Sequence, residues 1–312
     1  MNYAHRMLAG LLLPLCSFAQ TPPTSGPENA PTLRPSVVVE DEGPRYVAPN
    51  TLDRIGRIWA PVTIDGKGPY RLVLDTSGNS SAVIPAVVTS LGATARSEQV
   101  KLIGVTGTAL VPVIHVSSME VGELALGSAK LPVVADVFGG AEGVLGPKAL
   151  ADKRLFIDFR NDQIRITRSN GRVIEQGFTR VSMDTDRHQL ITFDIRVGGV
   201  KTKAILSTGA QRTIGNTALR EALLKRAREG HPESIVGVTL DVAEGVSIPV
   251  PPIFIGDLQF RNVSITFADT FIFDQWKMAR DPAILVGMDV IGSLDTLVID
   301  YRLQQLFIRA MR

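Results

Sequence analysis

The chain has 312 residues, of which 45% are hydrophobic, and this is enough to form two domains with cores of ordinary size. Its 33 Lys and Arg residues nearly balance its 31 Asp and Glu residues. The composition therefore gives no reason to expect nucleic acid or an anionic membrane surface as a partner.

The first twenty residues have the pattern of an export signal. Arg6 supplies a positive charge, residues 8–15 are an apolar run, and Ser17-Phe18-Ala19 is a small-x-small cleavage site. We therefore predict a signal peptide at residues 1–19 and a mature chain that is periplasmic or secreted. The apolar run is too short to cross a bilayer, so no membrane span is expected. Lipidation of Cys16 is the less favoured alternative, because the residue before it is not small.

Residues 20–50 are predicted to form an extended linker or arm. The segment contains seven prolines and few large apolar residues outside residues 37–39. Such a composition cannot offset the entropy lost on ordering. A tether is the favoured role, and occupation of a groove, as by a pro-segment, is the alternative.

From Ile58 onward the sequence contains alternating or short apolar runs that end at Gly or Asp, which is typical of β-strands. Such runs occupy residues 62–64, 72–74, 111–114, 131–134, 193–197 and 204–206. Helices are predicted at Thr217–Glu229, between the N-cap Asn216 and Gly230, and at Ala86–Leu91, before Gly92. The chain is therefore predicted to be mostly β, with one short helix in each half.

The same short pattern occurs twice, as Leu74-Asp75-Thr76-Ser77-Gly78 and as Leu206-Ser207-Thr208-Gly209-Ala210. The copies are 132 residues apart (207 − 75), and Gly104-Val105-Thr106 repeats as Gly237-Val238-Thr239 at an offset of 133 (237 − 104). Because both patterns recur at nearly the same offset, the sequence indicates two homologous lobes, which we place at residues 51–170 and 185–312.

An insertion is predicted in the second lobe. Leu145-Gly146 corresponds to Val286-Gly287 at an offset of 141 (286 − 145), eight more than before (141 − 133). The extra residues are expected near residues 271–281.

Each lobe resembles one lobe of an aspartic peptidase, because an apolar strand ends in the motif and an apolar-apolar-Gly triplet follows seventy residues later in the first lobe (145 − 75). Two such lobes in one chain are similar to bilobal bacterial members of the retropepsin/pepsin superfamily. The resemblance extends from about Ile58 to Ile308.

The resemblance implies a cleft between the lobes, with one carboxylate from each motif on its floor. Two carboxylates about 3 Å apart cannot both ionise, so one stays protonated to polarise the scissile carbonyl while the other takes a proton from the attacking water. An extended polypeptide is the implied ligand. Neither a cofactor nor a metal is implied, and the histidines of the chain do not have the spacing of zinc ligands.

The resemblance also implies roles for the residues around the two carboxylates. Thr76 and Thr208 would cross-brace the two loops, and Gly209 and Gly78 would let the backbone approach the carboxylates. The turn made by Gly104, Val105, Thr106 and Gly107 would be the tip of a hairpin flap over the ligand.

The sequence departs from the family pattern at two positions. Ser207 stands where the second Asp is expected, and its hydroxyl does not titrate near neutral pH, so it cannot carry the shared proton. Ser77 stands at a usual Gly position, where a side chain would cost about 1 kcal/mol if the backbone needs a positive φ. We therefore expect Asp75 and Ser207 at the centre of a site whose second motif is degenerate.

Several residues near the second motif could in principle replace the missing acid. Asp184, Asp186 and Asp194 precede the second motif, and we expect them on a solvated turn beyond hydrogen-bond reach of the attacking water. Arg212 follows the motif and is hypothesised to pair with Asp75, which would oppose catalysis. A serine hydrolase is not predicted, because the chain contains no Gly-x-Ser-x-Gly elbow.

Two functions from different classes remain. The favoured one is a pseudoprotease whose cleft binds an extended polypeptide by strand addition, since loss of one half of a cooperating pair removes most of the rate. The alternative is an active aspartic-type endopeptidase that uses Asp75 with an unrecognised partner group. A scaffold role in the envelope is a third possibility. The oligomeric state is not predicted.

Overall fold

The computed structural model describes residues 34–40, 46–50, 57–78, 80–94, 97–122, 124–161, 163–171, 176–185, 190–223 and 229–311, the first two ranges by their backbone only. The predicted signal peptide, Asp186 and residues 224–228 of the predicted second helix lie outside the described residues. No helix within these ranges is long and apolar enough to cross a membrane.

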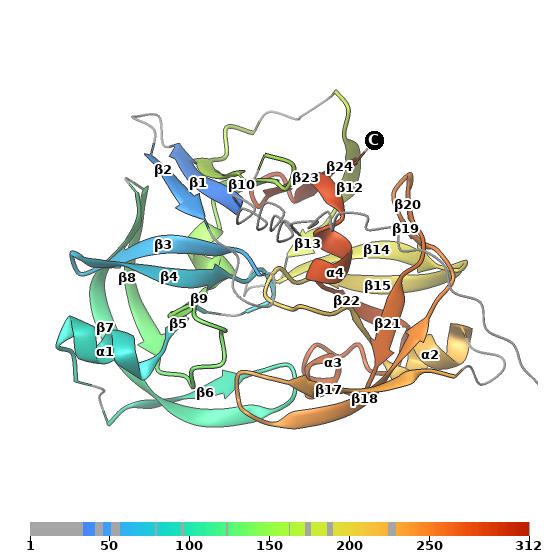
Figure 1. Cartoon of the computed structure of the whole chain (residues 1–312), viewed down its shortest axis with the longest axis horizontal. Helices are drawn as coiled ribbons and strands as arrows, with labels where there is room; N and C mark the ends of the chain where they lie inside the picture. Colours follow the sequence, from blue (N-terminus) through green and yellow to red (C-terminus); the bar gives the residue numbers. More distant parts are fainter. Residues whose placement is uncertain are drawn as a thin grey trace, which may run out of the picture. The chain divides into compact units, whose positions relative to one another are not determined.

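Lobe one is a sheet built around the strand that leads into the first motif (Figure 1). Helix α1 (Pro85–Leu91) follows β5. Strand β4 runs parallel to β9, with Leu74 opposite Leu145, so the end of β9 lies beside the first motif. The strands, in the order β5-β9-β4-β3-β7-β6 with β8 paired to β7, are β3 (Trp59–Ile64), β4 (Lys67–Leu74), β5 (Ala82–Val83), β6 (Gln99–Ile103), β7 (Thr108–Val121), β8 (Leu124–Pro132) and β9 (Gly143–Leu145).

Lobe two repeats this plan. Strand β15 runs parallel to β22, with Leu206 opposite Val286, as β4 does to β9. This confirms the predicted equivalence of Leu145-Gly146 and Val286-Gly287. The sheet has the order β17-β18-β21-β16-β22-β15-β14-β19-β20, with β13 paired to β14; the strands are β13 (Asp184–Thr185), β14 (Ile191–Val197), β15 (Val200–Leu206), β16 (Ile214–Gly215), β17 (His231–Val236), β18 (Val242–Pro249), β19 (Ile253–Ile255), β20 (Leu258–Phe260), β21 (Ser264–Phe267) and β22 (Ala283–Val286).

Both predicted helices begin close to where the sequence places them. Helix α2 spans Thr217–Leu223, and Oδ1 of Asn216 accepts a hydrogen bond of 2.9 Å from the backbone N–H of Leu219, as an N-cap does. Helix α1 ends at Gly92, whose φ of 65° is the left-handed conformation that favours glycine at this position.

The prediction of one helix per lobe was wrong for lobe two. Its described part also contains α3 (Phe271–Gln275), which lies in the predicted insertion, and α4 (Met288–Ile291). The counterpart of α4 in lobe one is a 3-10 turn, η1 (Pro147–Leu150). These segments of four or five residues are too short to show a helical period in the sequence.

A third sheet is shared by the two lobes. Its order is β12-β24-β23-β10-β11-β1-β2, with β10 (Lys153–Asp158), β11 (Gln163–Arg168), β12 (Thr179–Ser182), β23 (Leu294–Asp300) and β24 (Gln305–Ala310). Strand β10 of lobe one pairs antiparallel with β23 of lobe two, so that Leu155 lies opposite Ile299 (Figure 1). The residues of β10 and β23 fall in separate predicted lobes, and their pairing was not predicted.

The shared sheet also extends into the segment that was predicted to be a linker. Strands β1 (Arg34–Glu40) and β2 (Tyr46–Asn50) continue it, and β1 pairs in parallel with β11. The valine run at 37–39 has high β-propensity, and the free edge of β11 offers it backbone partners. This part of the arm therefore has more regular structure than its proline content suggests.

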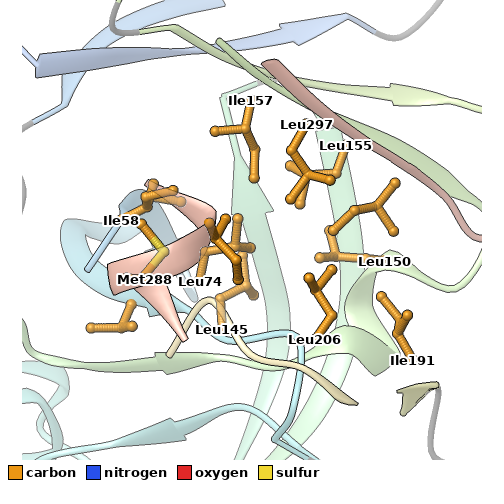
Figure 2. Close-up of a cluster of buried hydrophobic side chains, with 14 of the residues drawn as sticks. Ile58, Leu74, Leu145, Leu150, Leu155, Ile157, Ile191, Leu206, Met288 and Leu297 are labelled. Carbon is orange, nitrogen blue, oxygen red and sulfur yellow. The ribbon is translucent and has the colours of Figure 1, made fainter. Parts of the chain in front are cut away.

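A hydrophobic cluster connects the shared sheet with the strands that carry the motifs (Figure 2). Leu74 and Leu206, which directly precede the two motif residues, are buried together with Leu145, Leu155 and Leu297. The two motifs are therefore anchored in one core to which both lobes contribute.

A buried ion pair crosses the shared sheet. Arg154 on β10 lies opposite Asp300 on β23, and its Nη2 and Nε lie 2.6 and 2.7 Å from Oδ2 of the fully buried Asp300. The Ser169 hydroxyl and the Leu303 N–H, each 2.9 Å away, donate to the same carboxylate. The charge is thus fully compensated inside the protein.

Removal of the Arg154 guanidinium should destabilise the whole chain. In Arg154→Met the buried carboxylate of Asp300 loses its cation, and we expect the free energy of unfolding to fall by about 3–5 kcal/mol. Arg168→Met, on the neighbouring strand, removes an exposed pair with Asp152 and should cost less than about 1 kcal/mol. Chemical denaturation of both variants measures the difference, and equal losses would contradict this account.

Candidate active site

The two motifs begin at equivalent positions, directly after β4 and β15. The backbone N–H of Asp75 donates to the carbonyl oxygen of Leu145 at 3.1 Å, and the N–H of Ser207 donates to that of Val286 at 3.0 Å. Each motif residue is therefore held by the parallel strand beside it.

The two threonines form a reciprocal cross-brace between the loops. The Thr76 hydroxyl donates to the carbonyl of Leu206 at 2.8 Å and accepts from the Thr208 N–H at 3.2 Å. The Thr208 hydroxyl makes the matching bonds to the carbonyl of Leu74, at 2.7 Å, and with the Thr76 N–H, at 3.2 Å. Both side chains are completely buried. The role that the resemblance implies for these residues fits this geometry.

The Ser77 side chain connects Asp75 with Ser207. Its hydroxyl lies 2.7 Å from Oδ1 of Asp75 and 2.8 Å from the Ser207 hydroxyl, while its backbone N–H donates to the same Oδ1 at 2.8 Å. Ser207 also accepts a hydrogen bond of 3.1 Å from the Ala210 N–H. Ser77 does not have a positive φ, so the strain considered for a side chain at this position does not arise.

Gly209 is the lobe-two counterpart of Ser77, and its lack of a side chain is required. A β-carbon on Gly209 would lie 2.6 and 2.7 Å from the two carboxylate oxygens of Asp75, which is closer than such atoms can approach. Gly78 also faces this carboxylate, although a β-carbon there would lie 3.4 Å from Oδ2, an ordinary contact. Ser77 thus contacts Ser207, and its counterpart Gly209 contacts Asp75.

A cavity of about 410 Å³ lies over the motif residues. Its floor includes Asp75, Ser77, Ser207 and Gly209, and its apolar walls include Val105, Phe138, Ile272 and Trp276, so both lobes contribute. A larger hollow of about 530 Å³ lies on lobe two around Arg261, but it contains neither motif. The smaller cavity is therefore the candidate site.

The predicted flap is the turn between β6 and β7, closed by a bond of 2.9 Å from the Gly104 N–H to the carbonyl of Gly107. A second hairpin tip, between β17 and β18 of lobe two, meets it. A β-carbon on Gly237 would collide with the Thr106 hydroxyl, and one on Gly104 would make a tight contact of 3.2 Å with Cγ2 of Thr239, so the tips are in contact. The repeat of Gly-Val-Thr in the sequence was the signal for this second hairpin tip, which was not predicted.

The lobe-two insertion holds the first flap. The Ile272 N–H at the start of α3 donates to the carbonyl of Val105 at 3.2 Å, and Val105 packs against the cluster that contains Ile272 and Phe273. Asn216 anchors the other end of the insertion, because its side-chain amide donates to the carbonyls of Met278 and Asp281 at 2.9 and 2.8 Å. The flap of one lobe is thus tied to the other.

The ion pairs near the cavity differ from the prediction for Arg212. Arg212 lines the cavity, but its Nε binds Oε1 of Glu233 at 3.1 Å, so the hypothesised pair with Asp75 is not formed. Asp184 and Asp194 are exposed, bind Lys203 and do not line the cavity, as expected, but they lie in strands β13 and β14 and not on the predicted turn.

Two further polar side chains lie near the motifs. The Arg57 guanidinium lines the cavity and lies 5.7 Å from the centre of the Phe138 ring. Burial, and to a lesser degree the charge of Asp75, raises the pKa of the Tyr301 phenol. Tyr301 belongs to the core and does not line the cavity, so this neutral hydroxyl has no access to a ligand there.

A comparison with known proteins also finds two equivalent regions in the chain. A model of the aspartyl protease family matches residues 60–149 and again residues 193–290, which together make up more than half of the chain. The chain belongs to the aspartyl protease family. Each match contains one motif, so the aspartyl protease domain occurs twice. No curated protein matches the chain.

The cross-brace should be essential to the pairing of the two aspartyl protease domains. In Thr76→Val the Thr208 N–H and the Leu206 carbonyl lose their buried partner, and we expect a loss of about 2–4 kcal/mol in unfolding free energy. Thr76→Ser keeps the hydroxyl and should lose less than half of that. Thermal and chemical unfolding test this, and equal effects of the two substitutions would show that the hydroxyl is not what matters.

Proposed function

We propose that this aspartyl protease family protein binds an extended polypeptide segment in its cleft and hydrolyses it poorly or not at all. The observation that carries the proposal is that the Ser207 hydroxyl occupies the position of the second carboxylate and is bound within the protein, to Ser77 and to the Ala210 N–H. We further propose that the chain is exported by its signal peptide, and a mature N-terminus at Gln20 in a secreted or periplasmic fraction would support this.

The directions of the hydrogen bonds support the proposal of impaired catalysis. With Asp75 ionised, the Ser77 hydroxyl donates its only proton to Oδ1, so it must accept from Ser207. The Ser207 proton is therefore committed to Ser77. No proton remains on these two side chains to polarise a scissile carbonyl, which in aspartic peptidases is the task of the protonated carboxyl.

Within the described part of the chain, no other carboxyl group replaces the second Asp. Besides Asp75, the carboxylate that lines the cavity is Glu233, and it is bound by Arg212 and, at 2.5 Å, by the Thr266 hydroxyl. The alternative of an active endopeptidase would require Asp75 to act with a group that these contacts do not provide.

The side chain at position 77 limits which side chain can fit at position 207. In lobe two, a β-carbon at Gly209 would collide with the Asp75 carboxylate. By the pseudosymmetry of the motifs, the Ser77 side chain occupies the corresponding place beside residue 207. A serine at 207 leaves room for it, and we infer from the same symmetry that the carboxylate of an aspartate there would meet the Ser77 side chain. The site therefore departs from the family pattern at two coupled positions.

Wild-type protein is expected to show little cleavage of a mixed denatured-protein library between pH 3 and pH 8. Loss of half of a cooperating catalytic pair should lower the rate by about 1,000-fold or more relative to an intact dyad. Mass spectrometry of the products measures this, with Asp75→Ala in parallel. Cleavage by the wild type that disappears in Asp75→Ala would overturn the proposal and establish an active endopeptidase.

Restoration of proteolysis should require substitution of both Ser77 and Ser207. Ser207→Asp alone is expected to be destabilised and inactive, because the new carboxylate meets the Ser77 side chain. The double variant Ser77→Gly/Ser207→Asp rebuilds the two-carboxylate floor and should gain acid-dependent cleavage. Activity in the single Ser207→Asp variant equal to that of the double would show that the two positions are not coupled.

A further inference from the structure

We propose that the floor of the cleft is a binding site for a primary ammonium group of the bound polypeptide, from its N-terminus or from a lysine side chain. This inference rests on the proposed function and names the group that the former catalytic floor would recognise.

The side chains of the floor offer hydrogen-bond acceptors without donors. Ser77 donates to Asp75 and Ser207 donates to Ser77, so both hydroxyl protons are used inside the chain of three residues. Each hydroxyl oxygen keeps acceptor capacity, and a carboxylate accepts only. A carbonyl or carboxylate of the ligand would face acceptors here, whereas an ammonium brings three donors.

The second oxygen of Asp75 is the principal acceptor. The bonds from the Ser77 N–H and hydroxyl both go to Oδ1, and no described residue donates a hydrogen bond to Oδ2. Asp75 is only partly buried and lines the cavity. A charge-assisted bond from an ammonium to Oδ2 would complete the hydrogen bonding of this carboxylate.

The charged side chains of the cavity cancel one another, so the cavity as a whole does not attract an ammonium group. The charged side chains that line it are Arg57, Asp75, Arg212 and Glu233, and their formal charges sum to zero. Arg212 and Glu233 form a pair, and Arg57 lies over Phe138 on the wall of lobe one. Attraction of an ammonium therefore depends on direct contact with Asp75 and not on the field of the whole cavity.

The walls fit the carbon chain that carries such a group. Val105, Phe138, Ile272 and Trp276 line the cavity above the floor. Apolar walls over the floor carboxylate of Asp75 suit a lysine side chain, whose four methylene groups need burial while its terminal nitrogen needs an acceptor.

The experiment compares three peptides that differ in their amines. They are acetyl-Ala-Ala-Lys-Ala-Ala-amide, its norleucine analogue, and the norleucine peptide with a free N-terminus. Binding to the mature chain is followed by the NMR shifts of the backbone amides of Ser77, Gly78, Gly209 and Ala210. We expect at least one amine-bearing peptide to bind about tenfold more tightly than the capped norleucine peptide. Which of the two does so identifies the source of the ammonium.

The preference should disappear in Asp75→Asn, which keeps the shape and removes the charge. It should persist in Asp269→Asn, which removes an exposed carboxylate outside the cavity. Equal binding of all three peptides, or a preference that survives Asp75→Asn, would overturn the ammonium site and leave the polypeptide-binding cleft intact. Absence of binding by every peptide would overturn both.

Discussion

The reciprocal hydrogen bonds of Thr76 and Thr208 are the constraint on which the rest of the site depends. Each hydroxyl binds two backbone groups of the opposite loop, and each is completely buried. The positions of the two loops are therefore fixed by backbone and threonine contacts, independently of which residue begins each motif. This explains how the two motifs stay side by side although Ser207 lacks a carboxylate.

The floor of the cleft is best understood as one hydrogen-bonded unit. Asp75, Ser77 and Ser207 share two protons in a fixed direction, from lobe two toward lobe one. The chemistry that the floor presents to a ligand thus depends on a single carboxylate, whereas in a two-carboxylate site it depends on how the pair shares its proton.

The sequence was sufficient to predict the two lobes, the motif strands, the start of α2 and the end of α1, because these follow from a repeated pattern, short-range periodicity and local capping. The link through Ser77, the contact between the two hairpin tips and the pairing of Arg212 with Glu233 were not predicted. Each joins residues far apart in the chain, and neither spacing nor composition specifies which distant side chains meet. The same holds for the sheet shared by β10 and β23.

The shared sheet also determines which part of the chain must be present before the fold can close. Strand β10 pairs with β11, which follows it directly, and with β23, which lies near the end of the chain. Without β23, strand β10 has an unpaired edge on that side, and such an edge can pair with another chain. A chain that lacked its last strands would therefore present residues 153–158 as an open edge for association.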